Sequence, residues 1–147
     1  MFANEFKLVC DQQSIALVST FRSEYIRKKL DLGLSLYKSL NKYLTANNLA
    51  LTIIGFSGSD ESNKEFEFMK QNMPTAKWSL KAREHRLASY ESLQTCGIVV
   101  VDQSSLGYEM LGLGKRVGFF ASMEWSRSTH RFGKPLEFGE KGPFWTN

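Results

Sequence analysis

The sequence predicts one α/β domain, a Rossmann-like doubly wound parallel sheet with helices on both faces. Three observations support this prediction. Short apolar runs alternate with stretches in which apolar residues recur every three to four positions, so predicted strands and helices alternate along the chain. The run GIVVVD at Gly97–Asp102 is continuously apolar until its last residue, as in a strand covered on both faces. The 147 residues, 42% of them hydrophobic, suffice for one packed core.

The first predicted strand–helix unit occupies the N-terminal third of the chain. The apolar run at Ser14–Phe21 predicts a strand. Leucine, isoleucine and tyrosine recur at helical spacing through Glu24–Leu44, which predicts an amphipathic helix. Asn47 and Asn48 follow it, and asparagine is a common residue where a helix stops.

The second unit begins with the apolar run Leu49–Phe56, which predicts another strand. The helix that follows is expected to bury a face through Phe66, Met69 and Met73. Pro74 should end this helix, because proline removes a backbone donor and restricts the residue before it.

The next two elements lead to the continuously apolar strand. Ala76–Leu80 predicts a short, weak strand. Leu87, Tyr90 and Leu93 recur at intervals of three, which predicts a helix between this strand and Gly97–Asp102.

The last predicted unit has a short helix and a final strand. Ser105–Leu113 predicts the helix, and Gly114 is well placed to end it. Arg116–Ser122 predicts the strand, with Lys115 and Arg116 exposed to solvent at its start. We therefore expect a Rossmann-like nucleotide-sugar-binding domain over residues 1–122 and a mostly irregular segment over 123–147, packed on it or on a missing domain.

Charge and cysteine content narrow the class of protein. The chain has 19 basic and 15 acidic residues, a formal charge of +4, and no dense block of Lys or Arg, so we expect no nucleic-acid partner. Cys10 and Cys96 have neither metal-ligand nor disulfide spacing, which favours reduced thiols in a cytoplasmic protein. No membrane span or signal peptide is expected. His85 and His130 lack companion ligands, so we predict no metal site.

Small hydroxyl residues and glycines recur where the predicted strands end. Because ligands of open parallel sheets bind beyond the carboxyl ends of the strands, these positions are candidates for ligand contact. Loops favour the same residues for turn formation, which is the alternative explanation. The candidates from the first two strands are Ser19, Thr20, Arg22, Gly55 and Ser57.

The residues after Gly97–Asp102 are the most specific candidates. Ser104 and Ser105 fall where a helix should begin, and unsatisfied backbone amides there suit a phosphate. The common alternative is that one serine only caps the helix. Glu109 lies one turn after Ser105, where a carboxylate can accept hydrogen bonds from a ribose. Gly107 removes a side chain where a ligand could approach.

The stretch DQSSLGYEMLGLGKRVGFF, residues 102–120, resembles the nucleotide-binding segment of GT-B glycosyltransferases. It is similar to the signature D-S-[ST]-L-G-Y-E-x-L-x-x-G-K-[KR]-V of bacterial surface-carbohydrate and capsule polysaccharide transferases. The resemblance is strong over about 97–122 and looser over 14–60. It implies the donor-binding C-terminal half of a GT-B fold in surface polysaccharide biosynthesis.

The resemblance also implies roles for individual residues. Ser104 and Ser105 would contact the phosphate of a nucleotide sugar, and Glu109 its ribose. The donor would be CMP- or UDP-linked and would be the substrate, with no further cofactor. Serine pairs here also occur in Kdo and sialyl transferases, but the sequence lacks the His-Pro motif that many of those sialyltransferases carry. We assign no catalytic residue.

GT-B enzymes contain two Rossmann-like domains, and the first largely supplies the acceptor site and usually the catalytic base. The 147 residues suffice only for the second. We therefore expect an acceptor glycan or lipid-linked glycan to bind through a missing or separate N-terminal domain, with any peripheral membrane association through that partner. Two alternatives remain open: a non-catalytic nucleotide-binding module that completes a partner chain, and a fragment related to sugar-nucleotide epimerases.

Overall fold

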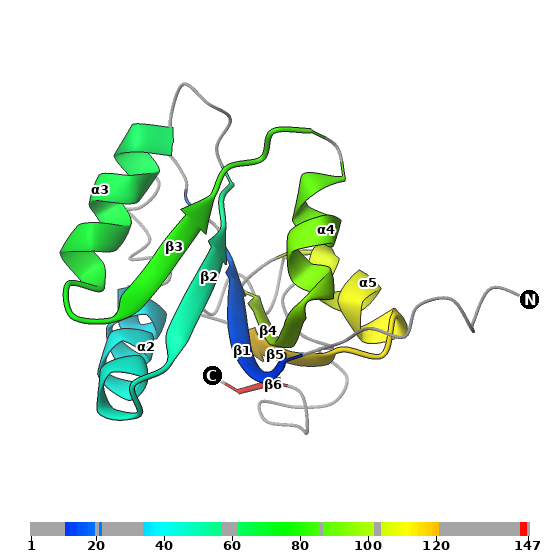
Figure 1. Ribbon diagram of the computed structural model, residues 1–147, viewed down its shortest axis with the longest axis horizontal. Coiled ribbons are helices and arrows are strands. Elements are labelled where there is room, and N and C mark those ends of the chain that lie inside the picture. The colour runs from blue at the N-terminus through cyan, green and yellow to red at the C-terminus, as the bar shows by residue number, and fades with distance from the viewer. Residues whose placement is uncertain are drawn as a thin grey trace, which may run out of the picture.

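The computed structural model describes residues 11–19, 21, 34–56, 62–85, 87–101, 104–120 and 145–146. Its parallel strands form one sheet in the order β3-β2-β1-β4-β5-β6 (Figure 1). The strands are β1 (Asp11–Val18), β2 (Ala50–Ile54), β3 (Lys77–Lys81), β4 (Cys96–Val101), β5 (Arg116–Phe120) and β6 (Trp145–Thr146). The helices are α2 (Leu34–Ala46), α3 (Ser62–Asn72), α4 (Ala88–Gln94) and α5 (Leu106–Gly112). The predicted Rossmann-like parallel sheet is confirmed.

Helices cover both faces of this sheet, with α2 and α3 on one side and α4 and α5 on the other (Figure 1). Successive residues of β1 show why, because strand side chains alternate between faces. Ile15 and Leu17 join a core cluster with α2 and α3, whereas Ala16 and Val18 join one with α4 and α5. The sheet therefore lies between two separate apolar layers, as the continuously apolar strands predict.

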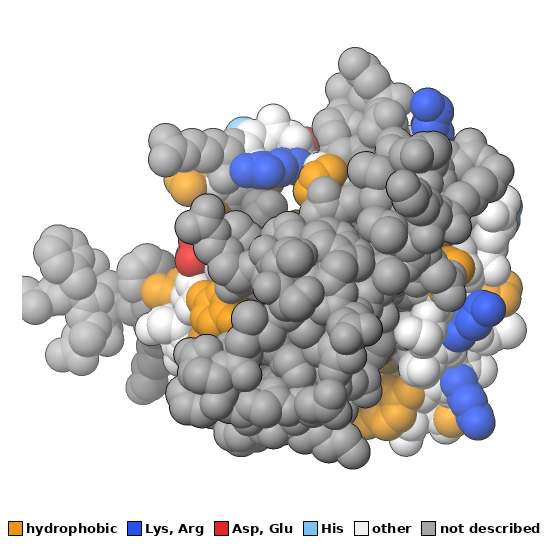
Figure 2. Space-filling model, turned by 180° about the vertical axis from the view of Figure 1, so that it is seen from behind, with side chains coloured by type: hydrophobic (Ala, Val, Ile, Leu, Met, Phe, Trp, Pro, Cys, Tyr) orange, Lys and Arg blue, Asp and Glu red, His pale blue; other side chains and the backbone are white. Residues whose placement is uncertain are grey.

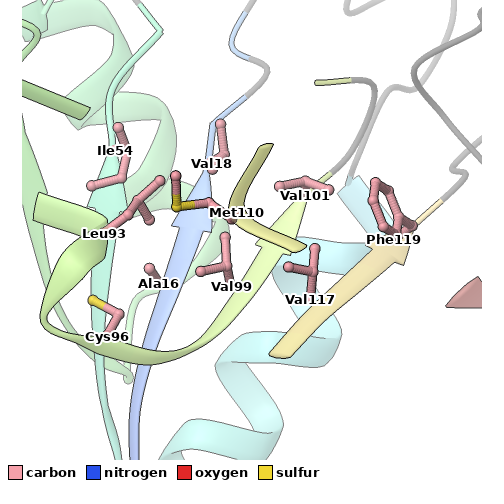
Figure 3. Close-up of a cluster of buried hydrophobic side chains, with 10 residues drawn as sticks. All are labelled: Ala16, Val18, Ile54, Leu93, Cys96, Val99, Val101, Met110, Val117 and Phe119. Carbon is pink, nitrogen blue, oxygen red and sulfur yellow. The ribbon is translucent and has the colours of Figure 1, made fainter. Parts of the chain in front are cut away.

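The layer under α4 and α5 supports the carboxyl end of β4. It draws buried residues from four strands and two helices (Figure 3). Its members are Ala16, Val18, Ile54, Leu93, Cys96, Val99, Val101, Met110, Val117 and Phe119. Each of them is at most 7% exposed, so both helices are anchored by close apolar packing.

Two helix ends follow the local signals in the sequence. Asn48 adopts a left-handed φ of 51° after α2, and the amide of Leu49 donates to the carbonyl of Leu44 at 2.9 Å. Gly114 has a φ of 79° after α5, and the amide of Lys115 donates to the carbonyl of Met110 at 3.0 Å. Both ends are Schellman motifs, in which a left-handed residue satisfies the last helix carbonyls. The predicted stops are confirmed.

On the α3 side of the sheet, Met69 and Met73 are buried as predicted, but the third buried position is Glu65 and not Phe66. Glu65, Met69 and Met73 are each at most 1% exposed, whereas Phe66 is 44% exposed. The buried positions recur every four residues, so the face includes Glu65, one residue before the expected phenylalanine. Phe66 instead packs edge-on against Trp78, with ring centroids 5.2 Å apart.

Some predicted elements extend beyond the described residues. The expected helix at Glu24–Leu44 is described only from Leu34, and most of 123–147 lies outside the described residues. Within that segment, β6 pairs with β5 through Phe119 and Trp145, which the sequence pattern does not predict. None of the described helices is long and apolar enough to cross a membrane. The described lysines and arginines on the face in Figure 2 are scattered and form no continuous patch there.

Lys115 is buried, contrary to the expectation of solvent exposure. It is 7% exposed, and its Nζ donates to the carbonyl oxygens of Gln94 at 2.5 Å and Cys96 at 2.9 Å. Gln94 is the last residue of α4, where helix carbonyls lack partners and carry partial negative charge. The ammonium group is therefore held inside because it satisfies acceptors at the end of α4 and the start of β4.

We predict that Lys115→Met lowers the free energy of unfolding by about 1–3 kcal/mol, because two carbonyl oxygens lose a charged donor. Urea denaturation followed by circular dichroism measures this change. The matched control is Arg116→Met at the neighbouring exposed position, which should change stability by less than about 0.5 kcal/mol. Equal stability of the two variants would contradict the assigned role.

Candidate functional site

The strand order reverses between β1 and β4. From β1, the chain passes through α2 to β2 and through α3 to β3, and then returns across the sheet to β4 on the other side of β1. Loops that leave the carboxyl ends of two such strands turn toward opposite faces, and this is where ligands of open α/β sheets bind. Val18 pairs with Val101 in register, so the chain leaves both strands at neighbouring points. The predicted candidates Ser19 and Ser104 follow these two residues.

Ser19 fixes the end of β1 against β2. It is 3% exposed, and its amide donates to the carbonyl of Ile54 at 2.9 Å. Its Oγ accepts a hydrogen bond from the amide of Phe21 at 3.1 Å. The Ser19 side chain therefore stabilises the backbone at the end of β1. Thr20 and Arg22, which we predict beside it, lie outside the described residues.

Gly55 allows close packing at the end of β2. A side-chain carbon there would lie 3.1 Å from the carbonyl oxygen of Lys81 and 3.3 Å from Oε2 of Glu65. The Gly55 amide donates to that same Lys81 carbonyl at 2.9 Å. These contacts give the glycine a packing role between β3 and α3. Ser57, the next candidate, is outside the described part of the chain.

Glu65 is a buried carboxylate that sequence reasoning missed. It is 1% exposed in the first turn of α3, and its Oε1 accepts a hydrogen bond from the amide of Phe56 at 3.1 Å. It therefore holds the backbone just after β2 against the start of α3. A glutamate four residues before the apolar Met69, on the same helix face, is the sequence signal that could have identified it.

The two serines before α5 have different roles. Ser104 Oγ accepts a hydrogen bond from the Leu106 amide at 3.3 Å, and the Ser104 carbonyl accepts one from Gly107 at 3.3 Å. These are the bonds of a helix cap. Ser105 is exposed, has helical φ and ψ of −60° and −26°, and makes no side-chain cap bond. Of the two serines, Ser104 therefore caps the helix with its side chain, and the Ser105 side chain does not.

Gly107 faces the sheet. A side-chain carbon at Gly107 would lie 2.6 Å from Cγ2 of Val101 and 2.8 Å from Cε1 of Phe119. The prediction that this glycine opens space for a ligand is therefore wrong, because the space of its missing side chain is already filled by β4 and β5. The glycine lets α5 lie close on the sheet, as glycines do where a helix packs tightly on a strand.

Glu109 is exposed on α5, where its Oε2 accepts a hydrogen bond from the hydroxyl of Tyr90 on α4. Tyr90 is half-buried and packs against the core cluster beneath both helices. The expected carboxylate is therefore present one turn into the helix after β4, and it is held by a side chain 19 residues away in sequence. Sequence reasoning placed Tyr90 only on an apolar helix face, and it has no signal for this contact.

A protein-family model matches residues 4–147 of the chain. The family is described as "putative O-antigen biosynthesis protein". The chain belongs to this family. Comparison with the curated proteins and comparison with the solved structures each found no match.

This O-antigen biosynthesis family member therefore acts in surface polysaccharide biosynthesis, as the sequence predicts at the level of the pathway. The structure brings Ser19 and Ser104 to the strand reversal, and it places Ser105 directly before the following helix and Glu109 on it. Within the described residues, no three His, Cys, Asp or Glu side chains gather as a metal site would require. His85 instead lies 3.3 Å from Oε2 of Glu91.

Replacing Gly107 by alanine should destabilise this O-antigen family protein by about 1–3 kcal/mol, because the methyl group would overlap Val101 and Phe119. Thermal and urea unfolding measure the effect. Gly112→Ala is the matched control on the same helix, since nothing lies within 4 Å of its added carbon. Alanine there should be neutral or stabilising by up to about 1 kcal/mol. If Gly112→Ala lost stability and Gly107→Ala did not, the assigned packing role of Gly107 would be wrong.

The serine pair offers a second internal comparison. Ser104→Ala should lower the free energy of unfolding by about 1 kcal/mol, because the helix loses its cap. Ser105→Ala should change it by less than about 0.5 kcal/mol, because that hydroxyl does not cap. Both values come from urea denaturation. A larger loss at Ser105 would show that the capping roles are exchanged.

Proposed function

We propose that the chain binds a nucleotide sugar at the reversal of strand order and acts as the donor-binding domain of a glycosyltransferase. The observation that carries this proposal is the exposed Glu109 carboxylate, held one turn into the helix that follows β4. The family match to O-antigen biosynthesis supports it, because a surface polysaccharide is assembled from activated sugars. The Rossmann-like strand order supports it too, since that order is typical of nucleotide-binding sheets.

The spacing of polar groups on α5 suits a nucleotide. Ser105 and Glu109 are four residues apart, so they lie about 6 Å apart along the helix axis and differ by about 40° around it. In the proposed complex, the Ser105 hydroxyl donates to a phosphate oxygen. The Glu109 carboxylate accepts from the ribose diol, since an ionised carboxylate only accepts hydrogen bonds. The donor would be a CMP- or UDP-linked sugar.

The proposed reaction is displacement at the anomeric carbon of the donor sugar. An acceptor hydroxyl forms the new glycosidic bond and gives up its proton, and the bond from the anomeric carbon to the nucleotide phosphate breaks. The phosphate keeps the electron pair and gains negative charge. Hydroxyl donors positioned around it stabilise that charge as it develops. We propose that Ser105 is one of these donors and that the acceptor and catalytic base come from another domain or chain.

The test is binding of nucleotides to the purified chain, with CMP, UDP and GDP and their sugar conjugates titrated by calorimetry. A bound ligand at 100 times its dissociation constant should add about 2.7 kcal/mol to the free energy of unfolding. Glu109→Ala should weaken nucleotide binding about tenfold, a loss of about 1.4 kcal/mol, with the fold intact because the side chain is exposed.

Glu67→Ala is the matched control, because Glu67 is an exposed glutamate on α3, which covers the other face of the sheet. It should leave the affinity unchanged. Absence of binding by every nucleotide in the panel would overturn the proposed function. Equal affinity of Glu109→Ala and the unaltered chain would remove the ribose role of Glu109.

A further inference from the structure

We propose that Tyr90 is a positioning residue that sets the preference of this site for ribose over deoxyribose. The inference rests on the proposed function, because it concerns the same carboxylate. It goes further by naming a residue from a different helix and the part of the ligand that it selects. Its basis is the hydrogen bond from the Tyr90 hydroxyl to Oε2 of Glu109.

Tyr90 is suited to hold a carboxylate in one place. Its ring packs against the apolar layer under α4 and α5, alongside Leu106, Tyr108 and Leu111. The layer contains Leu93 of the same helix and Met110 of α5, each at most 1% exposed. The tyrosine hydroxyl is therefore fixed by a rigid part of the core, and only its polar end reaches Glu109.

Glu109 needs such support because it lies on the surface. An exposed glutamate samples several rotamers, and ordering it costs side-chain entropy. A hydroxyl donor to an ionised carboxylate makes a strong, charge-assisted hydrogen bond that selects one arrangement. In the free protein, the Tyr90 bond therefore orders the carboxylate before a ligand arrives, which reduces the cost of binding.

The same bond gives the two carboxylate oxygens of Glu109 different roles. Oε2 accepts from Tyr90, and no other hydrogen bond to the Glu109 side chain is seen among the described residues. Oε1 is then the oxygen placed to accept from a ribose hydroxyl. A deoxyribose ligand lacks that hydroxyl and leaves Oε1 without a donor. The ribonucleotide therefore binds more tightly than the deoxyribonucleotide.

The experiment titrates the full chain with CMP and UDP and with their 2′-deoxy and 3′-deoxy forms. The unaltered chain should bind the ribose forms about tenfold more tightly than at least one deoxy form. Tyr90→Phe keeps the ring and removes the hydroxyl. It should weaken binding of the ribose forms about fivefold and leave the affinity for the less favoured deoxy form unchanged, so the ratio falls toward one.

Two further variants complete the design. Tyr43→Phe on α2 is the matched control, because Tyr43 is 55% exposed and lies on the helix layer of the other face. It should leave every affinity unchanged. Tyr90→Phe combined with Glu109→Ala should bind no more weakly than Glu109→Ala alone, because Tyr90 acts through the carboxylate.

The outcomes distinguish failure of the positioning role of Tyr90 from failure of the proposed function. If Tyr90 is purely structural, Tyr90→Phe should weaken binding of the ribose and deoxyribose forms equally, which would overturn the positioning role. The same follows if the unaltered chain shows no ribose preference, or if Glu109→Ala weakens binding and Tyr90→Phe does not. In the last case the proposed function still stands. If no nucleotide binds the unaltered chain, both proposals fail.

Discussion

Helix α5 packs against β4 and β5 with Gly107 directly over the sheet, and the position of the proposed site depends on this contact. Because a helix turns about 100° per residue, side chains two positions before and two after the glycine point away from the sheet. Those positions are Ser105 and Glu109, and both are exposed. The packing of Gly107 against the sheet therefore also fixes which way Ser105 and Glu109 point. A larger residue at Gly107 would displace or rotate the helix and move both polar groups together.

Polar bonds join α4 to the following elements near both ends of the α4–α5 layer. At one end the Tyr90 hydroxyl bonds Glu109, and at the other the Lys115 ammonium bonds the carbonyls of Gln94 and Cys96. The apolar layer of Figure 3 packs beneath both helices. The two bonds differ in burial, because Lys115 is 7% exposed whereas the Tyr90–Glu109 bond lies at the surface. The buried Lys115 bonds hold the helix layer together, and the Tyr90–Glu109 bond is accessible to a ligand.

Membership of an O-antigen biosynthesis family and a Rossmann-like sheet fit together chemically. Polysaccharide assembly consumes sugars activated as nucleotide esters, and open parallel sheets bind nucleotides where the strand order reverses. Near that reversal the described residues supply a buried serine at the end of β1, a capping serine before α5 and a buried glutamate that holds the backbone just after β2. Most of the predicted contact residues described here thus build the framework. Ser105 and Glu109 are the two whose side chains lie at the surface.

The sequence by itself determined the α/β class, the order of the elements from β1 to β5 and the helix ends at Asn48 and Gly114. These features depend on hydrophobic periodicity and on backbone preferences within a few residues. Glu109 could also be placed one turn after Ser105, because helix geometry is local. Only the tertiary structure decided that Lys115 and Glu65 are buried, that Gly107 faces the sheet, and that Tyr90 meets Glu109. Each of these depends on which elements pack together, and residues 19 positions apart in sequence carry no local signal of their contact.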